Sequence, residues 1–378
     1  MPNTPKVLFV FGTRPEAIKM APVIKVFKSE NDFETRVCVT GQHREMLDQV
    51  LSFFEINPDY DLELMRQDQT LYTLTSSIVE KLELVLEEFK PKYVFVHGDT
   101  TTTCISALTS FYAGCKVCHV EAGLRTYNKF SPFPEEMNRQ LTGRLADFHF
   151  APTIASRNNL LKEGTLDSTI KVTGNTVIDA LFDGVEKVKS STPSAIKKYL
   201  SRFDQEKHWI LVTGHRRENF GDGFLEICHA LKEIAQSRSN VEIIYPVHLN
   251  PNVQKPVFKI LDNVANVHLI SPLEYPSFIW LMNKSHFIIT DSGGVQEEAP
   301  SLGKPVLVMR NTTERPEAVE AGTVKLVGTD KNLIISASLS LIDDFSAYQR
   351  MSKSHNPYGD GKAANRILDF IKHLEYEN

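Results

Sequence analysis

The feature that most constrains the fold is the alternation of short apolar runs with longer amphipathic stretches along the whole chain. The apolar runs of the first half are KVLFVFG, TRVCVTG, YVFVHGD, KVCHVEAG, DFHFAPT and IKVTGN. Those of the second half are HWILVTGH, VEIIYPVH, VHLISP, HFIITDSGG, KPVLVMR and VKLVG. Runs of this length predict buried strands, and stretches such as LYTLTSSIVEKLELVLEEF predict amphipathic helices between them. Such strands form parallel sheets with helices on both faces.

The domain organisation follows from the length and from a restart of this pattern. The chain has 378 residues, more than a single hydrophobic core usually holds. The pattern restarts after a Lys- and Ser-rich segment at residues 186–198. We therefore predict an α/β fold with two Rossmann-like doubly wound domains that face a cleft. The N-terminal domain is predicted to span residues 1–174, completed by a C-terminal helix at residues 364–378, and the C-terminal domain to span residues 175–363.

Composition and charge disfavour several classes of partner. Hydrophobic residues make up 42% and charged residues 24%, as is typical of a soluble globular protein. The net charge of −5, without any block of basic residues, disfavours nucleic acid and anionic membranes as partners. No run approaches the ~20 apolar residues of a membrane span. The first apolar run is also too short for a signal peptide, so the expected location is the cytoplasm.

The cysteines and histidines do not predict a metal site. Five cysteines are an odd number, and most of them lie inside apolar runs. Cys115 and Cys118 form a C-x-x-C pair within a predicted strand, which favours core cysteines over a metal or redox site. No His, Cys or Asp pattern has the spacing of metal ligands, so we predict no metal.

Loops rich in ionisable residues follow the predicted strands. They are GTRPE, TGQHRE, HGDTTTT, EAGLRT, GHRREN, PVHLNP, TDSGGVQEE and MRNTTERPE. In open α/β sheets, ligands bind outside the carboxyl ends of the strands. The loops therefore predict an active cleft at these ends.

The sequence Arg-Pro-Glu-Ala occurs twice, at residues 14–17 and 315–318. One interpretation is a helix start, since proline suits the first turn, glutamate complements the helix dipole, and Thr13 with Glu16 fits a capping box. This explains the proline and the glutamate but not the arginine. We favour a second interpretation, in which Arg14 and Arg315 approach one anion from the two domains.

The segment TDSGGVQEEAPSLGKPVLV predicts a phosphate site. Ser292, Gly293 and Gly294 open a helix, where glycines admit a close ligand and free N–H groups bind phosphate. Glu298 lies one helical turn further and is placed to accept hydrogen bonds from a ribose. The alternative is a plain glycine turn with a carboxylate near the helix start.

A dinucleotide cofactor is disfavoured. The first strand is followed by FGTRPE instead of G-x-G-x-x-G, and the chain contains no P-loop. We therefore predict no cofactor and a phosphorylated substrate.

Three carboxylates and a histidine are the candidates for chemistry. Asp99 follows a strand and precedes four threonines, where it could also cap a helix. Glu121 directly follows the strand VCHV, and burial there would raise its pKa. Glu135, with Glu136 beside it, follows the restrained loop SPFP, and His215 ends the strand WILVTG beside two arginines.

Several motifs together resemble the non-hydrolysing UDP-N-acetylglucosamine 2-epimerases of bacteria. They are FGTRPEAIKMAP, GQHREMLDQV, HGDTTTT, HVEAGLRT, PEEMNRQL, TGHRREN, TDSGGVQEEAPSLGKPVLVMR, TTERPEAV and NPYGDG. The resemblance extends from Val7 to about Arg366. It implies the glycosyltransferase-B architecture and reversible interconversion of UDP-GlcNAc and UDP-ManNAc by elimination and re-addition of UDP, which supplies surface polysaccharide synthesis.

The resemblance also implies roles for individual residues. It assigns acid/base catalysis to Asp99, Glu121 and Glu135, with His215 as a further catalytic residue. It assigns substrate binding to Arg14, Lys19, Leu273, Phe278, Ser292, Gly293, Gly294, Glu298 and Arg315.

Some members of the family bind a second UDP-GlcNAc as an activator, and parts of that site match Gln42, Arg216 and His248. Glu45 and the segment NPDYDLELMRQDQT depart from the pattern of those members. The resemblance further implies a homodimer.

Two other functions remain open from the residues. A glycosyltransferase would share the fold and the UDP loop but would use Asp99 or Glu121 to activate an acceptor hydroxyl. A non-catalytic UDP-sugar sensor is the second alternative, and carboxylates in three separate loops argue against it.

Overall fold

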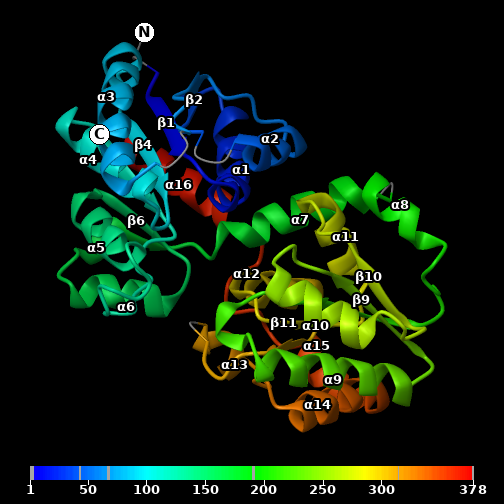
Figure 1. Ribbon diagram of the computed structural model, residues 1–378. Helices are drawn as coiled ribbons and strands as arrows, with labels where there is room; N and C mark the ends of the chain where they lie inside the picture. Colours follow the sequence, from blue (N-terminus) through cyan, green and yellow to red (C-terminus); the bar gives the residue numbers. More distant parts are fainter. Residues whose placement is uncertain (1–3, 42–43, 66–68, 190–191, 314, 377–378) are drawn as a thin grey trace. The chain divides into compact units, whose positions relative to one another are not determined.

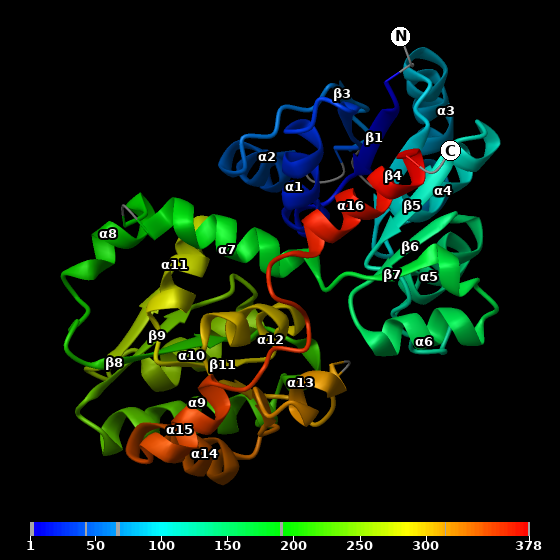
Figure 2. The same ribbon diagram turned by 180° about the vertical axis from the view of Figure 1, so that it is seen from behind.

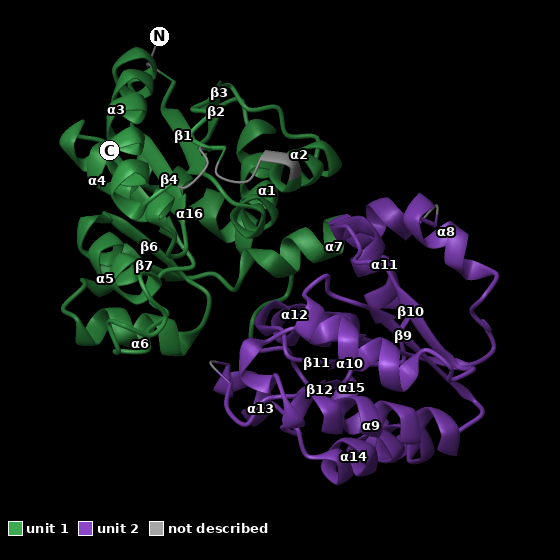
Figure 3. Cartoon of the chain, viewed as in Figure 1, with its two compact units in different colours: residues 1–183, 358–378 green, residues 184–357 purple. Residues whose placement is uncertain are grey.

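The computed structural model describes residues 4–41, 44–65, 69–189, 192–313 and 315–376 (Figure 1). Its contacts divide the chain into two compact units, coloured separately in Figure 3. Unit 1 ends at Asp183 and resumes at Tyr358, and unit 2 runs from Gly184 to Pro357. No helix among these described residues is long and apolar enough to cross a lipid bilayer.

Unit 1 contains a parallel sheet of seven strands. They are β1 (Lys6–Phe11), β2 (Glu34–Val39), β3 (Tyr60–Asp61), β4 (Tyr93–His97), β5 (Lys116–Val120), β6 (Phe148–Ala151) and β7 (Ile170–Val172). Their order is β3-β2-β1-β4-β5-β6-β7. The chain therefore reverses its direction of winding between β1 and β4, which creates a crevice at the carboxyl ends of these two strands.

The helices of unit 1 belong to the same chain segments as its strands, with one exception at the C-terminal end. They are α1 (Arg14–Lys28), α2 (Arg44–Phe53), α3 (Leu71–Phe89), α4 (Thr101–Tyr112), α5 (Glu135–Leu145), α6 (Ile154–Lys162), the 3₁₀ turn η1 (Asp167–Thr169), the start of α7 (Thr176–Lys189) and α16 (Ala363–Tyr376). Helix α16 lies alongside α1 in both views (Figures 1 and 2).

Aromatic side chains explain why α16 packs on unit 1. Phe9 of β1 stacks on Phe95 of β4 with ring centroids 4.7 Å apart. Phe95 in turn stacks on Phe150 of β6 at 6.0 Å. Phe370 of α16 meets Phe150 edge-on at 5.6 Å. Because burying each aromatic ring removes a large apolar area from water, this row fixes α16 against the sheet.

Unit 2 contains a parallel sheet of six strands. They are β8 (His208–Thr213), β9 (Val241–Pro246), β10 (Val267–Ile270), β11 (Phe287–Thr290), β12 (Val306–Val308) and β13 (Val324–Leu326), in the order β10-β9-β8-β11-β12-β13. Its winding reverses between β8 and β11, as that of unit 1 does between β1 and β4.

The helices of unit 2 include several short ones near the carboxyl ends of its strands. The elements are α8 (Ser194–Leu200), η2 (Arg217–Asn219), α9 (Asp222–Ser237), α10 (Pro251–Leu261), α11 (Tyr275–Lys284), α12 (Gly293–Glu298), η3 (Ala299–Leu302), α13 (Pro316–Glu320), α14 (Lys331–Asp343) and α15 (Phe345–Ser352). The core between α9, α14 and the sheet is built from buried aliphatic side chains such as Ile210, Leu231 and Ile289.

The predicted fold class is confirmed, because both units are Rossmann-like parallel sheets with helices. Each apolar run of the sequence contains a strand, whereas β3 was not predicted because its two residues form no apolar run. The boundary suggested by the sequence, residue 174, precedes α7, and the chain passes from unit 1 to unit 2 within that helix.

Candidate functional site

The crevice of unit 1 holds a buried carboxylate, that of Glu16. Its oxygens accept hydrogen bonds from the backbone N–H groups of Gly12 at 3.1 Å and Thr13 at 2.7 Å. They also accept from the hydroxyls of Thr100 at 2.7 Å and Thr103 at 3.0 Å. Burial raises the pKa of Glu16, and these hydrogen bonds oppose the rise. Glu16 therefore binds the loop after β1 to the first turn of α4.

Gly12 is required here because the backbone passes very close to its neighbours. A Cβ atom at Gly12 would lie 2.1 Å from Oγ1 of Thr40 and 2.9 Å from Oγ1 of Thr102. Arg14 is the first residue of α1 and is half-buried. The first Arg-Pro-Glu-Ala segment thus does begin a helix, with Glu16 as the capping glutamate.

Glu121 lies next to this crevice, directly after β5. Its carboxylate pairs with the ammonium group of Lys19 and accepts a hydrogen bond from Nδ2 of Asn175 at 3.0 Å. The second oxygen lies 3.8 Å from Nε2 of His97. The backbone φ of Glu121 is +62°, a conformation that costs free energy for a residue with a side chain. Such strain persists where the surrounding structure fixes the residue, as it does at many active sites.

Asp99 follows β4, the strand adjacent to β5, and interacts electrostatically with Glu121. The guanidinium of Arg139 donates to Oδ2 of Asp99 at 2.9 Å and 2.7 Å. Burial raises the pKa of Asp99 above its ordinary value, and the charge of Arg139 opposes that rise. The structure thus brings together the predicted residues Asp99, Glu121 and Lys19.

Glu135 is the first residue of α5, the helix that supplies Arg139. Its neighbour Glu136, which the sequence placed beside it after the same loop, is the buried one. The Glu136 carboxylate accepts from the backbone N–H groups of Thr126 at 2.9 Å and Tyr127 at 3.1 Å, and it pairs with Arg139 at 3.2 Å. Although burial alone would raise it, these bonds hold the pKa of Glu136 below its ordinary value. Glu136 therefore positions Arg139 on Asp99.

Three buried histidines stand on neighbouring strands of unit 1. His97 ends β4, His119 lies in β5 and His149 in β6, and His119 and His149 are paired in register. Burial lowers the pKa of His97 to about 4, of His119 to about 3 and of His149 to about 4. All three are therefore neutral at pH 7, and the one beside Glu121 adds no charge there.

The crevice of unit 2 also contains a buried carboxylate. Oδ2 of Asp291, directly after β11, accepts from the backbone N–H groups of His215 and Arg216, both at 2.8 Å. The His215 side chain is exposed, lies 3.8 Å from Asp291 through Nδ1, and stacks on His248 with centroids 4.9 Å apart. Burial and the nearby His215 lower the pKa of His248. Asp291 thus fixes the loop after β8 beside the loop that carries Ser292.

The helix start predicted at Ser292–Gly294 is present, since Ser292 precedes α12 as its N-cap residue. The guanidinium of Arg315 packs against Gly293, because a Cβ there would lie 2.8 Å from its Cζ. Nε of Arg315 donates to Glu297 at 2.7 Å. A Cβ at Gly294 would lie 3.7 Å from Oε2 of Glu298, so this carboxylate does sit one turn along beside the glycine turn.

The remaining predicted residues are spread over unit 2. Leu273 lies in the loop after β10, and Phe278 is half-buried in α11. Arg216 and His248 both lie at the carboxyl edge of the sheet, after β8 and β9. Gln42 falls outside the described residues.

Sequence reasoning missed Asn175, His97 and Asp291. His97 and Asp291 each end an apolar strand or follow it at once, which was the signal that could have identified them. Asn175 contacts Glu121 across 54 positions of sequence, and only the folded chain reveals that contact.

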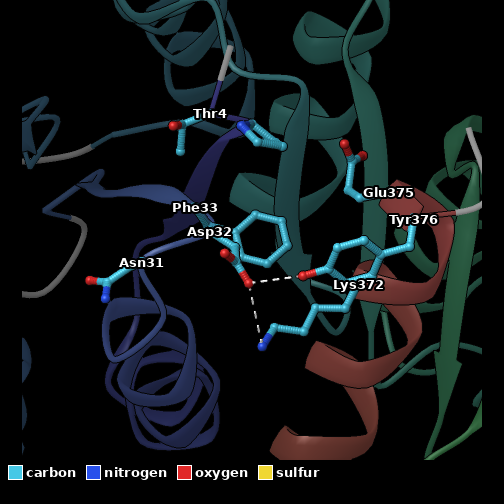
Figure 4. Close-up of a pocket in the computed structure, with 8 residues that line it drawn as sticks. Thr4, Asn31, Asp32, Phe33, Lys372, Glu375 and Tyr376 are labelled. Atoms are coloured by element: carbon cyan, nitrogen blue, oxygen red, sulfur yellow. Dashed lines mark hydrogen bonds and ion pairs between the residues drawn. The ribbon is translucent and has the colours of Figure 1, made fainter. Parts of the chain in front are cut away.

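Each unit contains a pocket, one at the amino edge of the unit 1 sheet and one at the carboxyl edge of the unit 2 sheet. A pocket of about 390 Å³ lies at the amino ends of β1 and β2 (Figure 4). Its charged residues pair with each other, as Asp32 does with Lys372 and with the Tyr376 hydroxyl. A polar pocket of about 400 Å³ lies at the carboxyl edge of unit 2, lined by residues 218–220, Gly223, Asn311, Thr312 and Thr329. Only the second is at the edge where open sheets bind ligands.

The described residues contain no group of three or more His, Cys, Asp or Glu side chains that could hold a metal ion. The five cysteines are free thiols, and four of them are buried, in agreement with a role in the core.

Comparison with known proteins identifies close relatives. A family model described as UDP-N-acetylglucosamine 2-epimerase matches residues 25–372. The chain is 59% identical over 371 residues to a UDP-N-acetylglucosamine 2-epimerase of Campylobacter jejuni, which covers 97% of each chain. It is 53% identical to the UDP-GlcNAc 2-epimerase of Neisseria meningitidis, solved with UDP-GlcNAc bound, with a TM-score of 0.86 over 97% of this chain and 100% of that one.

A more distant structure shares the fold alone. The glycotransferase of kitacinnamycin matches with a TM-score of 0.64 at 9% identity, over 98% of this chain and 99% of that chain. This likeness agrees with the glycosyltransferase-B architecture expected from the sequence.

Proposed function

Because the chain belongs to the UDP-N-acetylglucosamine 2-epimerase family, and is therefore an isomerase, we propose that it interconverts UDP-GlcNAc and UDP-ManNAc by elimination and re-addition of UDP. The observation that carries the proposal is the pair of carboxylates at the ends of adjacent strands. Asp99 follows β4 and Glu121 follows β5. Arg139 pairs with Asp99, and Lys19 pairs with Glu121.

The chemistry requires such groups because C2–H of the sugar is not adjacent to a carbonyl. In the forward step the bond from C1 to UDP breaks, a carboxylate takes the proton from C2, and the C1–C2 bond becomes the double bond of 2-acetamidoglucal. In the return step C2 is protonated on its other face, and an oxygen of UDP bonds again to C1. Proton removal and delivery on opposite faces need more than one acid/base group, each typically worth 10²–10⁴-fold in rate.

The carboxylates of unit 1 have distinct environments that suit different roles. Burial favours the protonated form of Asp99, while Arg139 favours the charged form. Glu121 pairs with Lys19, which favours the charged form needed in a base. We assign proton transfer at C2 to these two, together with Glu135 at the start of α5.

Unit 2 supplies the groups that hold UDP. We assign the diphosphate to Ser292, Gly293 and Gly294, the ribose to Glu298, and the base to Leu273 and Phe278. Arg315 packs against Gly293 and would stabilise the charge that develops on the leaving diphosphate, as His215 would from the loop after β8. Arg14 of unit 1 would act on the same charge.

The test is incubation with UDP-GlcNAc in D₂O, followed by NMR of the products. The proposal requires UDP-ManNAc to form and deuterium to appear at C2 of both epimers. A glycosyltransferase would instead transfer the sugar to an acceptor and leave C2 unlabelled. Formation of UDP-ManNAc without deuterium at C2 would reject elimination, and the absence of UDP-ManNAc would reject the activity.

We extend the proposal to the setting of the enzyme. The product would supply surface polysaccharide synthesis, in the cytoplasm, where free thiols such as those of this chain persist. We expect a homodimer, which sedimentation velocity would test. Arg216 and His248 would belong to an effector site for a second UDP-GlcNAc, and a sigmoidal rate curve in UDP-GlcNAc would support that site.

A further inference from the structure

The chain enters and leaves unit 1 at one junction, where two segments far apart in sequence are bound together. The backbone N–H of Asn175 donates to the carbonyl of Tyr358 at 2.6 Å. A Cβ at Gly174 would lie 3.3 Å from Cα of Gly359, so the two backbones are in direct contact. Asn175 precedes α7, which leads into unit 2, and Tyr358 is the first residue of unit 1 after the return.

Further bonds fix the same two segments. Nη1 of Arg366 donates to the carbonyl of Thr173 at 2.8 Å. The carboxylate of Asp179 accepts from the backbone N–H groups of Ala363 at 3.2 Å and Ala364 at 2.9 Å. Because Asp179 is in α7 and both alanines open α16, these bonds join the helix that leaves the unit to the helix that completes it.

The side chain of Asn175 reaches from this junction to the reaction centre. Its Oδ1 accepts from the backbone N–H of Val177 at 3.0 Å, which caps the start of α7. Its Nδ2 donates to Oε1 of Glu121 at 3.0 Å. Because one end of the amide is held by the start of α7 and the other end donates to Glu121, the orientations of the Asn175 and Glu121 side chains are linked.

We infer that Asn175 is a positioning residue, which orients the Glu121 carboxylate from the point where the chain leaves and re-enters unit 1. Lys19 supplies charge to the same oxygen, and the neutral His97 faces the other oxygen. The directional amide bond is what sets the carboxylate's rotation relative to the sugar. A misplaced base loses rate even when substrate binding is intact. The inference rests on the proposed function, in which Glu121 acts at C2.

The test separates the cap from the positioning contact. Asn175→Ser keeps a good helix cap but is too short to donate to Glu121. Asn175→Asp keeps both size and cap but replaces the donor by an acceptor. We expect Asn175→Ser to retain the melting temperature of the wild type within a few degrees, to lower kcat about ten- to a hundredfold, and to change KM less. Asn175→Asp should lower kcat at least as much and should also lower the melting temperature, because it places a second carboxylate beside that of Glu121. Asp330→Ser, the same kind of cap replacement on α14, should leave kcat unchanged.

A double variant makes the result decisive. In Glu121→Gln the base is already lost, so adding Asn175→Ser should lower kcat less than about twofold further, whereas independent effects would multiply. Wild-type kcat in Asn175→Ser, or an equal loss in both backgrounds, would overturn the inference. If Glu121→Gln itself keeps full activity, Glu121 is removed from proton transfer and the inference falls with it, whereas a wild type that forms no UDP-ManNAc would reject the proposed function.

Discussion

The two Arg-Pro-Glu-Ala segments follow strands in different units, yet a different side chain is turned inward in each. In unit 1 the glutamate, Glu16, is only 2% exposed and binds four donors. In unit 2 the arginine, Arg315, packs against Gly293 and pairs with Glu297. The same four residues therefore stabilise a loop in one unit and form part of a candidate anion site in the other.

A shift of one residue in the helix start explains the difference. Helix α1 begins at the arginine, so Glu16 is its third residue and reaches back to the N–H of Thr13. Helix α13 begins at Pro316, so Glu317 is the second residue and Arg315 takes the N-cap position. A repeated motif thus fixes the presence of a helix start but not its register, and the register decides which side chain points inward.

The largest difference that we expect between the units is in their stability to acid. The folded pKa values of His97, His119 and His149 lie near 4, 3 and 4, below the ordinary 6.5. Between pH 6.5 and 4 the unfolded chain therefore binds more protons than the folded chain. The free energy of unfolding decreases as the pH falls through this range. Each histidine contributes roughly 3 kcal/mol or more to this loss. The raised pKa values of Glu16 and Asp99 act in the opposite direction and offset part of it.

Two tryptophans make this prediction measurable. Trp209 and Trp280 are both buried in unit 2, so their fluorescence reports on that unit alone. Unit 2 has two comparable histidines: burial lowers the pKa of His286 to about 4, and it lowers the pKa of the buried His268, where the Glu242 carboxylate opposes the shift. On titration from pH 7 to 4, loss of helical circular dichroism should precede the change in tryptophan fluorescence. Coincident transitions would show that the histidines of unit 1 do not set its acid stability.

The next largest effect concerns the carboxylates of unit 1 to which we assign proton transfer. Asp99→Asn, Glu121→Gln and Glu135→Gln should each lower kcat by at least about 10²-fold, the lower range for acid/base groups. Substrate affinity should change much less, because UDP binding is assigned to unit 2. Steady-state kinetics with UDP titration calorimetry would check both. A variant that keeps near-wild-type turnover removes its residue from proton transfer.

A matched pair of substitutions compares the two glutamates directly. Glu16→Ala leaves the N–H groups of Gly12 and Thr13 without their acceptor in a buried site, so we expect a loss of roughly 2–4 kcal/mol. Glu317→Ala, at a half-exposed position of the other segment, should cost less than about 1 kcal/mol. Thermal unfolding followed by circular dichroism measures both. Equal losses would mean that the segments are equivalent after all.

The smallest effect distinguishes the two arginines. Arg315→Ala should weaken binding of UDP alone about ten- to a hundredfold, since a charge-assisted hydrogen bond is worth roughly 1.5–3 kcal/mol. Arg14→Ala should leave UDP affinity largely intact and lower kcat, because an interaction made mainly in the transition state does not contribute to ground-state binding. Calorimetry and kinetics on both variants would decide. Equal losses of UDP affinity would assign both arginines to phosphate binding.

Much of the fold could be predicted from the sequence because its signals are local. The period of apolar residues predicted the strands, and the loops after them predicted where ionisable groups gather. The short strand β3 was missed because Tyr60 and Asp61 carry no such pattern. The packing of Phe370 on Phe150 depends on contacts between distant segments, which no local pattern contains.

Only part of the candidate site could be predicted from the sequence. Asp99 and Glu121 could be placed at strand ends, and adjacent parallel strands brought them together. Their partners could not be predicted, because Arg139 and Asn175 reach them across 40 and 54 positions of sequence. Which member of the pair Glu135 and Glu136 is buried depends on the direction in which α5 leaves its loop.

The place of α16 in unit 1 has a consequence for how the protein is made. A ribosome adds residues 184–357 before it adds Phe370, at roughly 5–20 residues per second. Phe148 and Phe150 of unit 1 therefore await their covering helix while the whole of unit 2 is synthesised. Synthesis of unit 1 thus starts first and is completed last. Until α16 is made, the uncovered aromatic face of unit 1 is where a chaperone would bind.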